Sequence, residues 1–299
     1  MSPTLIHRLQ LLAAAALFST GGAAIKATTL SAWQVASFRS GIAALAVLLL
    51  VPAARRGWSW RVWLVGVPYA ATMVLFVGAT KLTTAANAIF LQSTAPVYVL
   101  LLSPWLLRER IRREDLWFMG AVAVGLGLFF LGAEVPRATA PDPLAGNLLA
   151  VLSGVFWAFT VLGMRWLGSR AGDTGSGLAT VVAGNAVAFL GILPLALPVA
   201  ATTAADWLTL AYLGVFQIAL AYVCLTLALR HVPALEASTL LLVEPALNPV
   251  WAWLVHGEVP GAWALAGGGV ILAATLLKTW WGARPPLRAR RGMEAEAPA

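Results

Sequence analysis

The sequence predicts an all-α polytopic membrane protein in which ten transmembrane helices form two inverted five-helix repeats. Of the 299 residues, 60% are hydrophobic and only 11% are charged, whereas soluble domains contain about 45–50% apolar and about 25% charged residues. The apolar residues form stretches of the length that crosses a hydrocarbon core of about 30 Å, which is about 20 residues. Two further observations, an internal repeat and an uneven placement of positive charge, give the arrangement of these helices.

The repeat is visible when residues 85–120 are laid on residues 234–269 without a gap, an offset of 149 (234 − 85). Identical residues then superpose at seven positions: Ala85/Ala234, Ala88/Ala237, Leu91/Leu240, Pro96/Pro245, Glu109/Glu258, Leu116/Leu265 and Gly120/Gly269. Each copy has an apolar stretch with a proline near its middle and a glutamate at its end, followed by a glycine-rich apolar stretch. Duplicated hydrophobic halves of this kind are typical of membrane transporters.

The ten expected helices follow the apolar stretches, and the charged residues lie mainly in the joints between them. In the first half they cover residues 9–29, 33–53, 62–81, 85–107 and 114–132. In the second half they cover residues 144–165, 177–199, 207–229, 234–256 and 261–281. The domains are therefore residues 1–133, a short polar linker with three prolines at 134–143, residues 144–282, and a basic tail at 283–299.

Positive residues favour one of the two sets of alternate helix ends. That set holds Arg8, Arg55, Arg56, Arg61, Arg108, Arg110, Arg112, Arg113, Arg165, Arg170, Arg230, Lys278, Arg284, Arg288, Arg290 and Arg291, and the opposite set holds Lys26, Arg39, Lys81 and Arg137. Because Lys and Arg are enriched in cytoplasmic loops, both termini are predicted to be cytoplasmic and the linker external. Five helices per half is an odd number, so the second repeat must enter the membrane inverted.

The net charge of +8 does not call for a nucleic-acid partner, because anionic lipid headgroups attract such a surface. Signals for catalysis are weak. Cys224 is the only cysteine, and the three histidines are scattered at helix ends, so neither a cysteine metal cluster nor a helical histidine pair is expected. The glycines of helices 114–132 and 261–281 are expected to allow close helix packing. No metal and no cofactor are expected.

Two segments resemble a known family: APVYVLLLSPWLLRE at residues 95–109 and EPALNPVWAWLVHGE at residues 244–258, each followed by a glycine-rich helix. Together with the chain length, the duplicated halves, and Lys26 and Arg39 in the first two helices, they resemble the EamA repeat of the drug/metabolite transporter superfamily. The resemblance covers essentially the whole chain. It implies a transporter of small metabolites, and the chain is most similar in character to bacterial exporters of aromatic amino acids.

Helix 234–256 contains the clearest group of candidate binding residues within a single helix. Glu244, Asn248 and Trp251 follow the i, i+4, i+7 spacing that places three residues on one helical face, and polar groups inside hydrocarbon generally mark functional sites. The equivalent residues of the first repeat are all apolar: Ala95, Val99 and Leu102. The site is therefore predicted to be asymmetric. The alternative is that Glu244 is a structural group bonded to a neighbouring helix.

Further candidates come from three other helices. A pocket for a zwitterionic amino acid needs donors, acceptors and aromatic or apolar walls, which would be supplied by Gln92, Tyr98, Trp157, Gln217 and Tyr222. Many of the fourteen tryptophans are instead expected to be interfacial anchors at helix ends, notably Trp58, Trp60, Trp63, Trp207, Trp280 and Trp281.

Pro96 and Pro245 are candidate hinges. Proline lacks the amide proton that would bond the carbonyl four residues earlier, which for Pro245 belongs to Leu241. The expected result is a loosened turn that serves either as a hinge or as a ligand contact. The alternative is a purely structural bend.

Four charged residues are candidate gate elements. Lys26 and Arg39 fall near the outer ends of the first two helices, where their side chains could simply reach water. The alternative is an outer gate, in which these cations pair with a carboxylate such as Glu258. Glu109 and Glu258 occupy equivalent positions of the two repeats. They are either ordinary helix-end residues or gate residues that act in alternation.

These observations predict an inner-membrane exporter of small metabolites, best described as amino acids including aromatic ones, that works as a monomer by rocking its two halves around a midplane cavity. The main alternative is a sugar or nucleotide-sugar carrier. A membrane-embedded enzyme would need a charged cluster that the sequence lacks, and a scaffold would leave Gln217, Glu244 and Asn248 unexplained.

Overall fold

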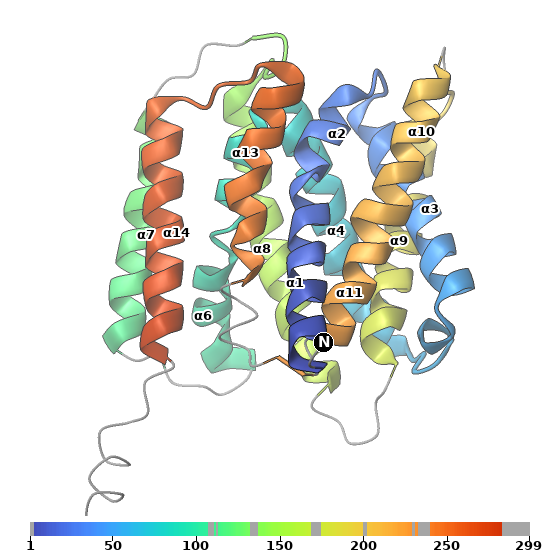
Figure 1. The fold of residues 1–299 in the computed structure, drawn as a ribbon, viewed down its shortest axis with the longest axis horizontal. Coiled ribbons are helices and arrows are strands. Elements are labelled where there is room, and N and C mark those ends of the chain that lie inside the picture. Colours follow the sequence, from blue (N-terminus) through green and yellow to red (C-terminus); the bar gives the residue numbers. More distant parts are fainter. Residues whose placement is uncertain are drawn as a thin grey trace, which may run out of the picture.

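The protein is described by a computed structural model in which residues 3–106, 111, 113–131, 137–168, 175–199, 202–228, 231–232 and 240–282 are placed. The described part is built from helices that run nearly parallel between two ends of the molecule (Figure 1). The first helix begins and the last helix finishes at the same end, which is the lower one in Figure 1. That end is the lower end of the molecule, and the opposite one is the upper end.

The helices of the first half are α1 (Pro3–Ser19), α2 (Gly21–Ala27), α3 (Ala32–Leu50), η1 (Pro52–Arg55), α4 (Trp60–Leu82), α5 (Ala85–Gln92), α6 (Ala95–Leu106) and α7 (Arg113–Leu131). Those of the second half are α8 (Pro143–Gly168), α9 (Ser176–Ala196), α10 (Ala204–Tyr212), the π-helical η2 (Leu213–Leu220), α11 (Ala221–Ala228), α13 (Val243–His256) and α14 (Ala262–Gly282). Within the described residues, each of the ten expected spans overlaps one helix or one broken helix, and residues 234–239 of the ninth span lie outside the described part. The prediction of an all-α polytopic fold is confirmed.

Seven helical stretches of the described part are long and apolar enough to cross a membrane, and the shorter apolar helices Asp115–Leu131 and Ala262–Lys278 accompany them. The protein is therefore a multi-pass membrane protein. Exposed tryptophans flank these spans, as expected for interfacial anchors: Trp58, Trp60, Trp63, Trp207 and Trp280 are each more than a third exposed. The side chain of Trp281 lies outside the described residues.

Several spans expected to be continuous are broken, and the breaks are informative. The first span divides at Thr20, between α1 and α2, and the fourth divides at Ser93 and Thr94, between α5 and α6. A turn at Leu242 precedes α13. With the 149-residue offset, Leu242 is the equivalent of Ser93, so the two repeats share a break just before Pro96 and Pro245. The loosened turn predicted at Pro245 is present, because proline cannot extend the hydrogen-bond ladder toward the preceding turn.

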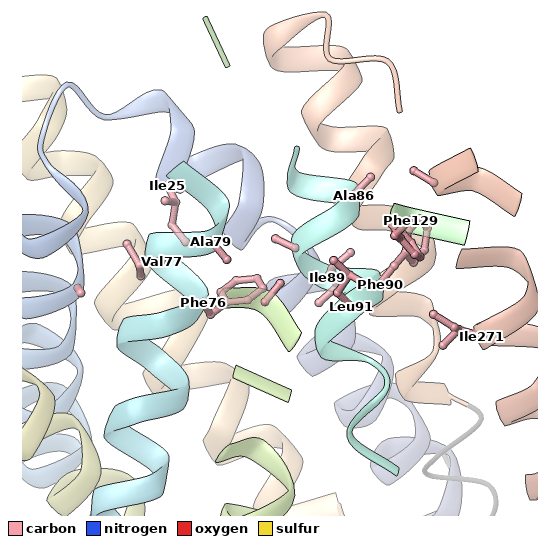
Figure 2. Packing of buried hydrophobic residues seen from close by; sticks show 14 of the residues in the cluster. Ile25, Phe76, Val77, Ala79, Ala86, Ile89, Phe90, Leu91, Phe129 and Ile271 are labelled. Carbon is pink, nitrogen blue, oxygen red and sulfur yellow. The ribbon is translucent and has the colours of Figure 1, made fainter. Parts of the chain in front are cut away.

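The largest apolar cluster packs α5 between α4, α7 and α14 (Figure 2). The Phe90 ring of α5 lies 6.2 Å from the Phe129 ring of α7, measured between centroids. A Cβ added at Gly268 of α14 would lie 2.6 Å from Phe90, and one added at Gly267 would lie 2.6 Å from the Gly125 carbonyl. These glycines allow the helices to approach, as predicted.

The same expectation is wrong for other glycines of the two helices. Gly120, Gly127 and Gly269 have open space where a Cβ would stand, as far as the described residues extend. They face away from the α7–α14 contact, so close packing does not explain them.

Candidate functional site

Side chains of the second half contact the break between α1 and α2. Ser19 and Thr20 donate their hydroxyls back to the carbonyls of Ala16 and Leu17, a pattern that competes with regular helix. Trp251 of α13 donates its indole N–H to Ser19 Oγ at 2.9 Å. The hydroxyls of Thr20 and Tyr212 are 2.8 Å apart.

The two glycines that follow this break leave room for amide side chains. A Cβ at Gly21 would lie 2.8 Å from Gln217 Nε2, and a Cβ at Gly22 would lie 2.7 Å from Asn248 Oδ1. Asn248 is completely buried, and neither its Nδ2 nor its Oδ1 has a hydrogen-bond partner among the described residues. An amide buried in this way normally has partners. The Asn248 amide is therefore an unsatisfied polar group that lies against the α1–α2 break.

Arg39 is the second polar group whose bonding is incomplete. Its side chain, 1% exposed, donates from Nη1 to Gln217 Oε1 at 3.5 Å and from Nη2 to the Met73 carbonyl at 3.2 Å. Nε has no partner in the described part of the chain. Gln217 belongs to η2, and π-helical turns are frequent at functional sites because they displace a side chain from the regular helical face. The contact joins α3 of the first half to the second half.

Aromatic side chains surround the Arg39 region. The rings of Tyr69 in α4 and Tyr222 in α11 are 5.5 Å apart between centroids, and Phe18 of α1 contacts Tyr222 edge-on at 5.0 Å. Trp157 of α8 packs against the same cluster. Asn185 Nδ2 donates to the Tyr69 hydroxyl at 3.0 Å. Aromatic rings with polar edges and a buried guanidinium thus share one part of the interior.

The upper end is held together by buried polar contacts between the halves. Lys26 of α2 and Glu258, just after α13, form an ion pair at 3.3 Å in which the two side chains are 4% and 1% exposed. Lys26 Nζ also donates to the carbonyls of Thr83, at 2.8 Å, and Thr139. Glu258 Oε2 accepts the Ala85 amide proton at 3.4 Å. The pair therefore connects α2, α5, the linker and the end of α13.

Other contacts reinforce this end. Lys81 Nζ donates to the Thr28 carbonyl at 2.7 Å, His256 Nε2 lies 2.8 Å from the Ala23 carbonyl, and Asp206 accepts the amide and hydroxyl protons of Thr29. We call the group formed by Lys26, Glu258 and these contacts the upper latch.

The sequence-predicted residues separate into distinct groups in space. Glu244, Asn248 and Trp251 share one face of α13, which meets α1 and α2. Gln217, Tyr222 and Trp157 belong to the Arg39 region. Gln92 lies apart, because its Nε2 donates to Ser153 Oγ of α8 at 2.7 Å.

Tyr98 also lies outside the Arg39 group. Its hydroxyl meets Thr94 Oγ1 of the neighbouring turn at 3.5 Å, a marginal hydrogen-bond distance. Pro96 and Pro245 stand in the first turns of α6 and α13. Glu109 lies outside the described residues.

Two expectations about the cations are corrected. Neither side chain extends to water. Lys26 is buried in its ion pair with Glu258, and Arg39 is enclosed between α3, α4 and η2. The pairing of Lys26 with Glu258 that the outer-gate hypothesis requires is present. Arg39 has no carboxylate within 4.0 Å among the described residues and lies with the polar-aromatic group.

Sequence reasoning missed Tyr69, Asn185, Ser19 and Thr20. Asn185 could have been found, because it is an amide inside an otherwise apolar span. Ser19 and Thr20 directly precede two glycines, which is a sequence typical of a helix break. Tyr69 had no comparable signal beyond its neighbour Pro68.

Comparison with known proteins also indicates a membrane transporter. The EamA-like transporter family matches residues 6–132 and 144–280. The pseudopaline exporter CntI of Pseudomonas aeruginosa is 30% identical over 268 residues, which is 87% of this chain and 90% of that protein. The threonine/homoserine exporter RhtA of Escherichia coli is 29% identical over 220 residues, which is 72% of this chain and 69% of that protein.

A solved crystal structure has the same fold. It aligns with a TM-score of 0.61 and 20% sequence identity, covering 93% of this chain and 99% of the other. At that identity the likeness concerns the fold alone.

Proposed function

Because this chain belongs to the EamA-like transporter family, we propose that it exports small amino-acid-like metabolites, including aromatic amino acids, across a bacterial inner membrane. The observation that carries the proposal is the unpartnered Asn248 amide, which the second half presents to the α1–α2 break. A buried amide without partners costs free energy unless a ligand completes its hydrogen bonds. The export functions of CntI and RhtA support the direction and the substrate class.

The surroundings of Asn248 and Arg39 favour a substrate with both polar and apolar parts. Gln217 and Arg39 offer donors, and Tyr69, Tyr222 and Trp157 offer ring surfaces. Stacked or edge-on rings stabilise an aromatic side chain by about 0.5–1.5 kcal/mol beyond the area that is buried. This combination suits a zwitterion with an aromatic side chain.

Transport would proceed by alternating access of the two inverted halves. The upper latch joins the halves at the end we assign to the cell exterior, so its separation would release substrate outward. Pro96 and Pro245, at equivalent breaks, are the proposed hinges. Lys26 and Glu258 are the proposed outer gate. Glu109, the equivalent of Glu258 in the first repeat, is the proposed gate residue of the opposite end.

Transport by purified protein in liposomes tests the function. The assay compares uptake of labelled phenylalanine, threonine, glucose and a nucleotide sugar into liposomes that contain the parent or Asn248→Ala. We expect amino-acid exchange by the parent and its loss or weakening in the variant. Movement of sugars without amino acids would replace the proposal by the sugar-carrier alternative, and movement of neither would contradict both.

Orientation is tested separately by cysteine labelling in whole cells. In a Cys224→Ala background, Ala138→Cys places a thiol at the upper end, in the exposed linker turn. Ala53→Cys places one at the lower end, in the exposed η1 turn. We expect an impermeant reagent to label the first in intact cells and the second only after lysis. The reverse pattern would contradict cytoplasmic termini.

A further inference from the structure

The structure holds two ionisable side chains of opposite sign that the fold does not pair with each other or with another charged residue of the described part. The first is Arg39 of α3, in the first half, and the second is Glu244 in the first turn of α13, in the second half. Gln217, which accepts a hydrogen bond from Arg39, lies against Gly21, and Asn248, one helical turn after Glu244, lies against Gly22, so both groups adjoin the α1–α2 break. Tyr222 contacts Phe18 beside the same break. Lys26 and Glu258, by contrast, pair directly.

Arg39 lacks a compensating anion. Its described contacts are a carbonyl at 3.2 Å, an amide oxygen at 3.5 Å and the Met73 sulfur at 3.8 Å, and Nε is left without a partner. A buried charge without a counter-charge is costly in a membrane protein and generally marks a functional site. Guanidinium is the group whose planar donors best match a carboxylate in a bidentate arrangement.

Glu244 has the complementary property. No hydrogen bond of its carboxylate to the rest of the described chain is present, although the side chain is partly buried at the start of α13. An ammonium group, with three donors, is the cationic partner that would satisfy such a carboxylate.

From this arrangement, and resting on the proposed export of amino acids, we propose that Arg39 and Glu244 form a two-point site for the zwitterionic head of the substrate. Arg39 binds the substrate carboxylate and Glu244 binds its ammonium group, while Tyr222 and Gln217 line the space between them. Each half of the protein supplies one charge, so the substrate connects the halves. Compounds that carry only one of the two charged groups are recognised poorly.

Substrate analogues test the assignment residue by residue. Phenylalanine, its carboxamide (no carboxylate) and 3-phenylpropionate (no ammonium) compete for uptake of labelled phenylalanine into liposomes that contain the parent, Arg39→Gln, Glu244→Gln, or Arg56→Gln. Arg56 is exposed at the lower end and serves as the matched control. For the parent and the control we expect both analogues to compete about ten- to a hundredfold more weakly than phenylalanine, the loss that corresponds to one charge-assisted hydrogen bond.

The variants should change selectivity in opposite ways. Arg39→Gln should remove the preference for phenylalanine over its carboxamide and keep the preference over 3-phenylpropionate. Glu244→Gln should do the reverse. If either variant weakens all three compounds equally, its role is structural and the two-point site is wrong, although amino-acid transport by the parent leaves the proposed function intact. If the parent moves no amino acid, the proposed function itself fails.

Binding to the parent provides a second measurement that needs no variant. Thermal unfolding of the purified parent in detergent should shift upward with phenylalanine and less with either analogue. Equal shifts with all three compounds would overturn the inference, even where Arg39→Gln does not fold. Arg39→Lys, which keeps the charge but loses the fork of donors, should retain the preference over the carboxamide in weakened form.

Discussion

Lys26 and Arg39 are cations of the first two membrane spans, and both side chains are buried, but their bonding partners differ. Lys26 is paired with Glu258 at 3.3 Å and bonded to two carbonyls, whereas Arg39 meets an amide, a carbonyl and a sulfur atom. The paired cation joins the two halves at the upper end of the bundle. The unpaired cation lies among aromatic rings in the interior, where an anionic ligand would complete its bonding. Sequence position alone does not separate these two roles.

The largest expected effect is on stability and comes from breaking the pair at the upper latch. Lys26→Met leaves Glu258 buried with only the Ala85 amide as its described partner. Removing one member of a buried ion pair typically destabilises by about 3–5 kcal/mol. Chemical unfolding in detergent measures the loss.

The double variant Lys26→Met/Glu258→Gln is the control for this measurement. It removes both charges, so it should recover most of the lost stability. If Lys26→Met is as stable as the parent, the pair does not hold the upper end, and the contrast with Arg39 disappears.

The next effect concerns the packing of the α1–α2 break. Gly22→Ala would place a methyl group 2.7 Å from Asn248 Oδ1 and 2.9 Å from the Ala85 side chain. Overpacking of this kind costs about 1–3 kcal/mol. Gly120→Ala on α7 meets open space and should instead be neutral or stabilising by up to about 1 kcal/mol. Thermal unfolding of the two variants compares them, and equal midpoints would mean that the break is looser than the contacts indicate.

How far the sequence predicted this molecule can be judged from α5–α6 and α13. Their shared break was expected from Pro96 and Pro245, and their chemical difference from the pairs Ala95/Glu244 and Val99/Asn248, since proline chemistry and repeat offsets are local properties. The break at Thr20 was missed because Ser and Thr are common in transmembrane helices. The position of Arg39 was misjudged because the length of the side chain allows it to reach water, and only the packing of α4 and η2 prevents this.

A smaller effect on stability, of the opposite sign, is expected at Arg39. Arg39→Met removes a buried charge that has no anionic partner in the described part, so stability should stay the same or rise by up to about 1 kcal/mol, because desolvation of the guanidinium is relieved. Lys26→Met, measured in parallel, should fall as argued above. A loss at Arg39 as large as that at Lys26 would show that its three contacts are structural, and the distinction between a latch cation and a ligand cation would be lost.

The smallest effect on stability is expected at Asn248, where it separates binding from packing most cleanly. Neither polar atom of the Asn248 amide has a partner among the described residues, so Asn248→Ala removes no hydrogen bond from the free protein. The cavity that the substitution leaves lowers stability and the loss of an unsatisfied polar group raises it, so the change in unfolding free energy should lie within about 1 kcal/mol of zero.

Substrate affinity should nevertheless weaken about tenfold, the loss expected when one hydrogen bond to the ligand is removed. Val99→Ala, at the equivalent position of the first repeat, is the matched control and should leave affinity unchanged. Unfolding and uptake measured on the same preparations decide the matter: if Asn248→Ala loses stability and affinity together, or if both variants transport like the parent, then this face of α13 is packing and not part of the binding site.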